Sequence, residues 1–556
     1  MKFVGPREKI NSDAEFDLIC IGSGIAGMAA AVAAAELCMR ATIIEKSAKI
    51  GGTTSWSSGI VWVGNSHLAR TAAVNDSAEE TRAYLDYLGG GRNDPQITAR
   101  FVEESPRALK FFAEDVGLPF YTLEGLADHY YPLGNGSKPK GRSHQLQPFD
   151  ATSLGSWQNK LDRTPFAHGR MTFEEMTAAG GWGGYRNLDA KLVAQRQAQD
   201  VRTLGGAVAG HFFKAALDRN IPFQLETGAN QLILQDGRVV GVEVSSGEKT
   251  RTFVATKGVV LATGKYDASP RLMDWFDEFN PWPPHGSPRN QGDGLVMALE
   301  IGAAFTVMHW NLSVKLGRHV KGETVDGQPV LRVAGTHELG HPHGILVNRA
   351  GRRFADESSF GDVASRLRHF DFASHRLLNV PCYFIFDAQY LRKYGLPPVP
   401  PGAEAPDWLP RAPTLGQLAN VLRVDAAGLA ETVERFNGFA ATGEDADFQR
   451  GRMSWSRQAA GDLTHKNPNL GEISEPPFFG FEMHPFGGNS VGLMTNGNGQ
   501  VLHLRGKTIP GLYACGDVVS LEHVGVGFQA GLPLAGGMTF GWLAAQDAAQ
   551  KYFKTD

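Results

Sequence analysis

The sequence predicts an α/β fold in which a Rossmann-like dinucleotide-binding domain carries an inserted α+β domain. Residues 16–45 contain, in order, an apolar run, a glycine-rich turn, an alanine-rich stretch and a second apolar run that ends on an acid. A similar glycine-rich pattern returns near the C-terminus, after a region of mixed predicted strands and helices at about 290–475. Because 556 residues are too many for one compact core, two or more domains are expected.

The turn in the first of these stretches reads GSGIAG. Its glycines have separate roles in a dinucleotide-binding unit: Gly22 permits the tight strand-to-helix turn, Gly24 lets backbone approach a pyrophosphate, and Gly27 allows the helix to pack on the sheet. The diphosphate is expected on the N–H groups at the positive end of the helix. Ser23 and Ala26 complete the turn and are expected at the same site.

The helix is expected to continue to about residue 39 and to lead into a buried strand, Ala41–Ile44. Glu45 follows that strand and is placed to accept hydrogen bonds from a ribose diol. A membrane segment is the alternative for Leu18–Met39, but Glu36, the glycine turn and the lack of a basic flank argue against it. No transmembrane segment is expected.

Composition excludes several classes of partner. A formal charge of −4 and a pI near 6.5 give no reason to expect nucleic acid or an anionic membrane surface. The four cysteines are scattered without CxxC or metal-ligand spacing, so no metal site is predicted and a reducing compartment is expected. The first residues are polar and mixed, unlike a signal peptide, and the cytoplasm is the expected location.

A second loop, rich in Gly, Thr and Ser, comes directly after Glu45. A nicotinamide dinucleotide does not need such a loop, whereas the ribityl hydroxyls and the ring of a flavin dinucleotide need small residues and backbone donors. The loop therefore favours FAD over NAD. Its residues that are expected to bind FAD are Lys46, Gly51, Gly52, Thr53, Thr54, Ser58 and Gly59.

Two later apolar runs, Gly258–Gly264 and Gly511–Asp517, are expected to be buried strands that end in small residues. An Asp at such a strand end is expected to hold a ribityl hydroxyl. The last helix opens at 534–536, where its N–H groups can face the pyrimidine edge of the flavin. The residues predicted to bind the cofactor from these segments are Thr263, Gly264, Gly516, Asp517 and Leu534.

The remaining segments are assigned by their apolar spacing and turn residues. Residues 77–118 are expected to be helical, and Asp236-Gly237 is expected to turn a hairpin. About 125–190 is rich in Gly, Pro and aromatics, a long loop of the kind that is functional or forms a lid. The changes of texture divide the chain into residues 1–285 and 478–556, the dinucleotide-binding domain, and residues 286–477, the inserted domain.

Taken together, these blocks resemble the FAD-dependent superfamily of fumarate reductases and 3-ketosteroid dehydrogenases over nearly the whole chain. The motifs that carry the resemblance are GSGIAG, GGTTSWSSG, ATGKY, NQGDG, GILVN with GRRF, and GLYACGD with the helix after it. The resemblance implies an FAD-binding domain with an inserted capping, or catalytic, domain. GGTTSWSSG lacks the histidine that carries flavin in respiratory succinate dehydrogenases, so FAD is expected to bind non-covalently.

Two chemistries compete within this superfamily. Fumarate reductases hold a dicarboxylate with arginines and histidines, but the corresponding stretches here, 358–362 and 530–533, contain no arginine. The 3-ketosteroid Δ1-dehydrogenases and cyclohexanone dehydrogenases are more similar. In DHYYP, Tyr130 or Tyr131 matches their catalytic tyrosine, and Gly531 matches the glycine whose N–H supports the substrate carbonyl.

This branch of the resemblance has two departures: Phe360 and Gly527 stand where the steroid enzymes carry tyrosines. A steroid substrate with the usual tyrosine set is therefore in doubt, and a simpler cyclic ketone remains open. The predicted reaction is FAD-dependent α,β-dehydrogenation of a cyclic ketone such as cyclohexanone or a 3-ketosteroid. The alternatives are a fumarate-reductase-like ene-reductase acting on an unsaturated acid or enone, and a non-catalytic flavoprotein.

Desaturation beside a carbonyl requires a donor to the carbonyl oxygen, a base for the α-proton and flavin N5 as the hydride acceptor. Gly531 is the candidate donor. Tyr130, Tyr131 and Tyr185 are the candidate bases, and neighbours must lower the reference phenol pKa of about 10 for this role. The electrons are expected to pass to a quinone, a carrier protein or an artificial dye.

Overall fold

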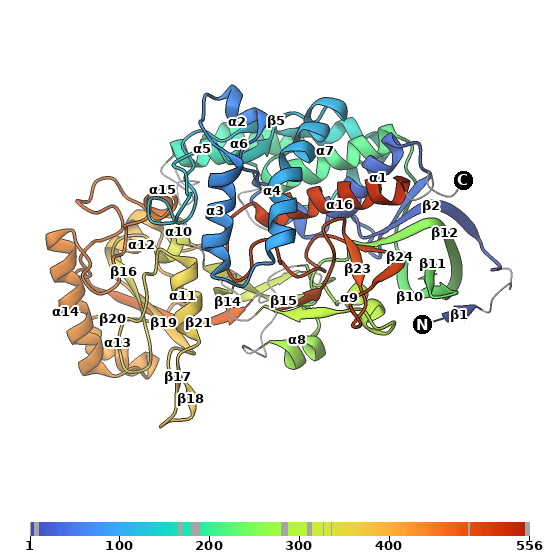
Figure 1. Cartoon of the computed structure of the whole chain (residues 1–556). Helices are drawn as coiled ribbons and strands as arrows, with labels where there is room; N and C mark the ends of the chain where they lie inside the picture. Colours follow the sequence, from blue (N-terminus) through green and yellow to red (C-terminus); the bar gives the residue numbers. More distant parts are fainter. Residues whose placement is uncertain are drawn as a thin grey trace.

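The computed structural model describes residues 2–4, 10–164, 170–179, 189–277, 279, 287–308, 314–325, 327–334, 336–486 and 490–550. Figure 1 shows two bodies side by side, each built on its own large sheet. We call the first the dinucleotide-binding domain and the second, at the left of Figure 1, the capping domain. Tyr185, one of the candidate bases, lies outside the described residues.

Parallel strands form the centre of the dinucleotide-binding domain, in the order β9-β3-β2-β12-β24 among the described residues. Their bounds are β2 (Ala14–Ile21), β3 (Ala41–Ile44), β9 (Phe223–Gln224), β12 (Lys249–Leu261) and β24 (Thr508–Ala514). Strands of a parallel sheet are covered on both faces and therefore read as continuous apolar runs. The apolar runs of the sequence therefore predicted these strands. The predicted strands that end near Ile21, Ile44, Leu261 and Ala514 are confirmed.

An antiparallel meander extends the same sheet through β10 (Gly228–Gln235) and β11 (Arg238–Ser246) to β12. Asp236 and Gly237 form its turn, with φ values of 51° and 75°. These positive values belong to the type I′ geometry that Asp-Gly favours, so the predicted hairpin is confirmed. The outer strands of the sheet are β1 (Lys2–Val4), beside β10, and β23 (Gln500–Leu502), beside β24.

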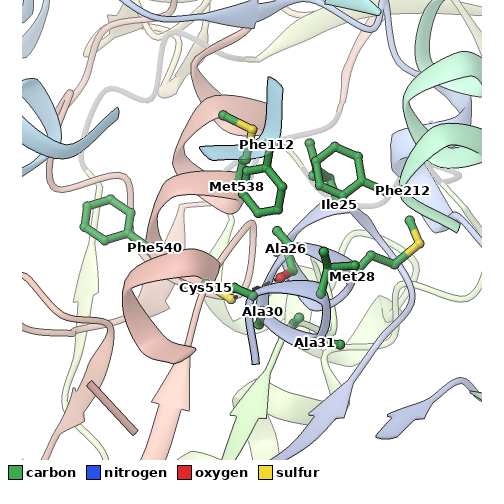
Figure 2. Close-up of a cluster of buried hydrophobic side chains, with 14 of the residues drawn as sticks. Ile25, Ala26, Met28, Ala30, Ala31, Phe112, Phe212, Cys515, Met538 and Phe540 are labelled. Atoms are coloured by element: carbon green, nitrogen blue, oxygen red, sulfur yellow. Dashed lines mark hydrogen bonds between the residues drawn. The ribbon is translucent and has the colours of Figure 1, made fainter. Parts of the chain in front are cut away.

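Two helices with small side chains, α1 (Ile25–Glu36) and α16 (Leu532–Gln550), pack against each other over this sheet (Figure 1). Figure 2 shows the contact, where Ala26 and Ala30 lie beside Cys515 and Met538. A Cβ added at Gly541 would lie 2.6 Å from the carbonyl oxygen of Ala26, so the helices meet this closely only because glycine stands there. The resulting core holds the glycine turn rigidly at the start of α1.

The segment predicted to be helical at 77–118 forms α3 (Ala78–Gly89) and α4 (Pro95–Lys110), followed by a π turn at Phe111–Asp115. Ser77 and Asp94 accept hydrogen bonds from the first-turn N–H groups of these helices, which is the usual N-cap arrangement. The prediction is confirmed, with a break between the two helices. In the same layer, α7 (Leu204–Asp218) packs on α1.

Short elements complete this domain. They are a 3₁₀ turn (Gly52–Trp56), β4 (Val61–Trp62), α2 (His67–Thr71), β5 (Phe120–Thr122), β6 (Ser143–Leu146), β7 (Phe149–Asp150), a 3₁₀ segment (Ala151–Lys160), α5 (Phe173–Ala178), α6 (Ala190–Ala198), β8 (Val201–Arg202), α8 (Pro270–Phe276), α9 (Asp293–Leu299), β13 (Phe305–Val307) and β22 (Val491–Leu493).

The capping domain is built on an antiparallel sheet in the order β15-β14-β21-β19-β16, with β20 beside β21. Its strands are β14 (Lys315–Val325), β15 (Gln328–Ala334), β16 (Gly344–Val347), β19 (Cys382–Phe386), β20 (Arg411–Ala412) and β21 (Phe478–Phe486). Its helices are α10 (Thr336–Leu339), α11 (Phe360–Leu367), α12 (Ala388–Tyr394), α13 (Leu415–Leu422), α14 (Ala426–Thr442) and α15 (Ser454–Ala460). A small hairpin joins β17 (Phe370–Asp371) and β18 (Arg376–Leu377).

The strands of the capping sheet span residues 315–486, whereas the sequence suggested boundaries at 286 and 477. At the first boundary, α9 and β13 pack on the dinucleotide-binding domain, with β13 paired to β22. At the second, β21 pairs with β14 and β19 and is a central strand of the capping sheet. The glycine-rich texture returns only after this strand. None of the helices that the structure describes has the length and hydropathy needed to cross a bilayer.

Candidate active site

The two glycine-rich loops of the sequence meet at the start of α1. Ser23 Oγ accepts a 3.1 Å hydrogen bond from the backbone N–H of Gly51, and Thr54 Oγ1 accepts one of 3.1 Å from the N–H of Ile25. The GSGIAG turn and the GGTT loop are therefore one structural unit. The prediction that residues from both loops serve one site is consistent with this geometry.

Glu45 lies at the end of β3 and faces the glycine turn. Its carboxylate accepts hydrogen bonds from Ser23 Oγ at 2.6 Å, from Ser23 N–H at 3.1 Å and from Ser47 N–H at 2.8 Å. The acid proposed for the ribose thus also holds the turn in place. Lys46, another predicted cofactor residue, pairs through Nζ with the carboxylate of Asp293.

The three glycines of the turn differ in the space around them. A Cβ at Gly22, where φ is +110°, would lie 2.2 Å from the carbonyl oxygen of Ala262, and one at Gly27 would lie 2.0 Å from that of Gly22. A Cβ at Gly24 would meet only Thr54 Oγ1, at 3.4 Å. Gly22 and Gly27 are therefore required by the fold, whereas the space beside Gly24 is open to a ligand, as a pyrophosphate site requires.

The carboxyl ends of β12 and β24 border the same space, as expected for ligands at the ends of parallel strands. Asn290 Nδ2 bridges Thr53 Oγ1 at 3.3 Å and Asp267 Oδ1 at 3.0 Å, which joins the GGTT loop to the segment after Gly264. Lys265 Nζ lies 4.0 Å from Asp517 Oδ2. The predicted cofactor residues Thr263, Gly264, Gly516 and Asp517 all lie at these two strand ends.

Two buried hydroxyl groups beside these loops indicate a site for a polar ligand. Ser55 Oγ and Thr263 Oγ1 are buried and have no hydrogen-bond partner in the part of the chain that the structure describes. Since buried polar groups are normally satisfied, such atoms fit a site whose ligand supplies the missing partners. Two predicted residues have other contacts: a Cβ at Gly59 would lie 2.3 Å from Leu204 backbone, and the Ser58 carbonyl accepts from Gln145 at 2.8 Å.

A small pocket lies where the two domains meet. Its lining residues are His129, Tyr130 and Phe528 from the dinucleotide-binding domain and Ser358, Ser359, Phe360, Gly361, Met453, Trp455 and Ser456 from the capping domain. The rings of Phe360 and Phe528 meet edge to face at 6.1 Å, and those of His129 and Trp455 lie 4.0 Å apart. No arginine or lysine is among these lining residues; half of them have aromatic rings, and three are serines.

Tyr130 lines this pocket, and Tyr131 does not. The Tyr130 ring meets Tyr87 edge to face at 5.7 Å. Burial, with further contributions from Tyr87 and Asp362, raises the pKa of Tyr130 above its ordinary value. Burial is the main cause of the raised pKa, so this structure does not show the lowering of the Tyr130 pKa that a base at neutral pH requires. Tyr131 is partly exposed, and its carbonyl oxygen accepts from Ser454 N–H at 3.0 Å, which attaches α15 to the segment.

Gly531 lies directly before α16, with a φ of +95°. Its Cβ would lie 2.7 Å from Ile60 Cγ2 and 2.8 Å from Trp62 N, so only glycine fits. First-turn N–H groups have no partner inside their own helix and can bind an oxygen. The Gly531 N–H makes no hydrogen bond within the described ranges, which suits the predicted role as a donor to a carbonyl. Leu534, predicted to face the flavin, lies in the first turn of α16.

A buried ion-pair group, which the sequence analysis missed, supports the segment of Tyr130. Arg142 donates to Asp76 at 2.6 Å and to Asp128 at 3.0 Å, and Trp62 Nε1 donates to Asp128 at 2.8 Å. Arg142, Asp76 and Asp128 are each at most 2% exposed. Asp128 is the first residue of DHYYP, Arg142 belongs to GRSH, and Asp76 lies far before both in the sequence. Their pairing depends on burial, which a sequence pattern does not reveal.

The sequence analysis also missed a lysine beside the pocket. Lys315 Nζ lies 5.8 Å from the ring centroid of Phe528, within cation–π range. Lys315 is the first residue of β14 and is only partly exposed. Burial, and secondarily Lys265, lowers the pKa of Lys315 to about 8, so its ammonium is still charged at neutral pH.

The family model described as FAD binding domain matches residues 17–537. The chain belongs to this family. FAD is therefore its cofactor, and the residues that would hold it are those of the two glycine-rich loops and the ends of β12 and β24. The open space beside Gly24 and the unpartnered buried hydroxyls fit this group.

Named relatives extend over nearly the whole chain. It is 32% identical to the 4-oxocyclohexanecarboxylate 2-dehydrogenase of Sinomonas cyclohexanicum, covering 96% of this chain and 93% of that protein. It is 30% identical to the 3-oxosteroid 1-dehydrogenase of Mycobacterium tuberculosis, covering 97% and 99%. The crystal structure of 3-ketosteroid Δ1-dehydrogenase from Sterolibacterium denitrificans with 1,4-androstadiene-3,17-dione matches with a TM-score of 0.86 at 29% identity, covering 97% and 100%. The resemblance predicted from the motifs, the fold and the cofactor are confirmed.

Proposed function

We propose that this FAD-dependent oxidoreductase desaturates a cyclic ketone, forming the carbon–carbon double bond α,β to the carbonyl. The observation that carries the proposal is the pocket between the domains, whose lining is half aromatic, contains no arginine and includes a single tyrosine. An apolar ring with a ketone suits such a wall, whereas a dicarboxylate requires paired cations. The relatives named for 4-oxocyclohexanecarboxylate and 3-oxosteroids support the same substrate class.

Each reacting group has a candidate partner in this chain. The Gly531 N–H is the donor to the ketone oxygen, where negative charge develops as the α-proton leaves. Tyr130 is the acceptor of the α-proton, in preference to Tyr131, because only Tyr130 lines the pocket. The acceptance of hydride from the β-carbon is the chemistry that FAD supplies when bound. Phe360, Phe528 and Trp455 exclude water from the reacting carbons.

The pocket's hydroxyl groups also bear on the kind of ketone. Phe360 contributes a phenyl ring where the steroid enzymes are expected to carry a phenol, and it faces Phe528. Tyr130 is the only phenol among the lining residues of the described chain. We therefore favour a monocyclic ketone over a steroid. We further propose a quinone, a carrier protein or a dye as electron acceptor, and a cytoplasmic location, because all four cysteines are free.

Anaerobic mixing tests the reaction directly. The purified yellow holoenzyme is mixed with cyclohexanone, a 3-ketosteroid or succinate, and the flavin absorbance is followed. Bleaching by a cyclic ketone, with the enone as product, supports the proposal. Bleaching by succinate alone would establish the fumarate-reductase-like alternative instead, and an absence of bleaching by any compound of the panel would favour a non-catalytic flavoprotein.

A further inference from the structure

A cation that the proposed reaction does not use lies over the ring of Phe528, one of the lining residues of the pocket. Lys315 extends from the first position of β14 in the capping domain to Phe528, a lining residue from the dinucleotide-binding domain. It therefore lies where the substrate pocket and the cofactor site adjoin, since Asp517 and Lys265 are also near it.

The Lys315 ammonium makes no direct ion pair with an acid in the described residues, although Asp517 and Asp267 attract it at longer range. Within the described residues Lys315 Nζ takes part in no hydrogen bond or ion pair, and its contact at short range is the cation–π contact with the ring of Phe528. Of the nearby charges, Asp517 faces Lys265 at 4.0 Å, and Asp267 accepts from Asn290 at 3.0 Å. Other partly buried lysines are paired, for example Lys138, whose Nζ lies 2.6 Å from Glu80 Oε1.

A partly buried cation without a carboxylate in direct contact is costly to hold in a protein and gains most from an anion that is desolvated with it. An ammonium binds a carboxylate through short charge-assisted hydrogen bonds. One such cation at the edge of an aromatic pocket matches a ligand with one negative charge. It does not match a dicarboxylate, because the described lining residues include no lysine or arginine and the other nearby lysine, Lys265, lies 4.0 Å from Asp517.

We propose that Lys315 binds a carboxylate on the ring of the substrate, so that the substrate class is an alicyclic ketone carrying one carboxylate. This inference rests on the proposed desaturation and specifies its substrate. The ring would lie against the edge-to-face pair of Phe360 and Phe528, with the ketone toward Gly531 and the carboxylate toward Lys315. Lys315 is then a residue that determines specificity and takes no part in the bond changes.

Two ketones that differ only in charge test this inference: 4-oxocyclohexanecarboxylate and its neutral amide, 4-oxocyclohexanecarboxamide. With wild-type holoenzyme at pH 7, we expect kcat/KM to favour the carboxylate by roughly 10–100-fold, mainly through KM, as a charge-assisted hydrogen bond would give. Lys315→Met should remove this preference and leave the amide nearly unchanged, and Lys315→Arg should retain part of it. Lys393→Met, which changes a capping-domain lysine away from the pocket, should have no effect on the ratio.

The outcomes separate the two proposals. Equal kcat/KM for acid and amide in the wild type, or equal losses for both in Lys315→Met, would overturn the role of Lys315 while leaving desaturation intact. If neither ketone bleaches the flavin, desaturation itself fails. Titration calorimetry with cyclohexanecarboxylate, which has no ketone, then decides the role of Lys315: binding that is lost in Lys315→Met supports it, and binding that is absent or unaffected overturns it.

Discussion

The backbone N–H of His129 donates a 2.8 Å hydrogen bond to Oε1 of Gln529, and the N–H next to Gln529, that of Ala530, donates to Nε2 of His129 at 3.4 Å. This reciprocal pair ties the segment of Tyr130 to the turn of Gly531. Tyr84 adds a third bond, from its hydroxyl to Oε1 of Gln529 at 2.7 Å. The proton acceptor and the carbonyl donor proposed for the reaction are thus held relative to each other by one buried amide.

Replacing that amide should impair catalysis without loss of cofactor. We predict that Gln529→Met lowers kcat by about 10–100-fold, because misplacement of reacting groups by about 1 Å can cost that much. FAD content should stay near wild type, since Gln529 contacts neither glycine-rich loop. Tyr84→Phe is the matched control: it removes one donor but keeps the His129 bond, and its kcat should fall less than about threefold. A Gln529→Met enzyme with normal turnover would show that the bridge does not position the groups.

The two adjacent tyrosines should differ strongly. We predict that Tyr130→Phe lowers the rate of flavin reduction by about 10²–10⁴-fold, the usual contribution of a positioned proton acceptor. Tyr131→Phe should change it little, because Tyr131 does not line the pocket. Stopped-flow absorbance under anaerobic conditions measures both rates. Similar losses in the two variants would argue against the assignment of Tyr130.

The raised pKa of Tyr130 has a consequence for the pH dependence. A phenol whose pKa lies above its ordinary value is almost wholly protonated at neutral pH, so the proton-accepting form is scarce and becomes more abundant as pH rises. We therefore predict that the rate of flavin reduction by a neutral ketone rises by up to about tenfold per pH unit through the neutral range. A neutral ketone is needed so that ionisation of Lys315 does not contribute. A rate that does not change with pH would contradict this prediction.

Gly24→Ala should separate cofactor binding from folding. Because the added Cβ would meet only Thr54 Oγ1 at 3.4 Å, the apoprotein should fold normally, but the Cβ would project into the space assigned to the pyrophosphate. We predict an FAD dissociation constant raised by at least about tenfold, the factor that corresponds to about 1.4 kcal/mol. Gly416→Ala in α13, whose Cβ has nothing within 4 Å, is the control and should bind FAD as the wild type does. Equal affinities in the two variants would place the pyrophosphate elsewhere.

The buried charges around Arg142 should dominate the stability of the Tyr130 segment. Arg142→Leu leaves Asp76 and Asp128 buried without a counter-charge, which typically costs about 3–5 kcal/mol. We predict a clearly lowered midpoint of chemical denaturation for the holoprotein. Arg82→Leu, which breaks the exposed pair with Asp86, is the control and should shift the midpoint little, since surface pairs contribute at most about 1 kcal/mol. An equally small shift in Arg142→Leu would contradict the prediction.

Sequence patterns predicted the structure correctly at positions where the backbone geometry permits only one residue type. Gly22 and Gly27 could be assigned because their backbone contacts, at 2.2 and 2.0 Å from a Cβ, exclude any side chain. The parallel strands were visible as apolar runs, and Asp236-Gly237 as a turn with positive φ. The choice between Tyr130 and Tyr131 required the structure, because two neighbours in a loop have the same pattern but different surroundings.

Other parts of the site could not be predicted because they depend on distant packing. Lys315 and Phe528 are far apart in the sequence, and a lysine at the start of a strand carries no local signal of its role. Gln529 lies in a glycine-rich turn, where its partner at 129 cannot be recognised from either segment. The boundary predicted near residue 477 preceded a strand whose partners, β14 and β19, lie in the capping sheet. The end of the capping domain is therefore set by the pairing of β21 with β14 and β19, which the amino-acid composition does not show.

The two strands that begin and end the capping sheet are neighbours: Lys315 of β14 lies opposite Phe486 of β21 in an antiparallel pair. The chain therefore leaves the dinucleotide-binding domain and returns to it at two points about 5 Å apart, which is the spacing of adjacent strands. An insertion with such closely spaced ends can be exchanged as a cassette between related flavoproteins without rebuilding the host. Because residues 358–361, 453, 455 and 456 of the pocket lie within this cassette, a single recombination event could transfer substrate preference while leaving the dinucleotide-binding domain untouched.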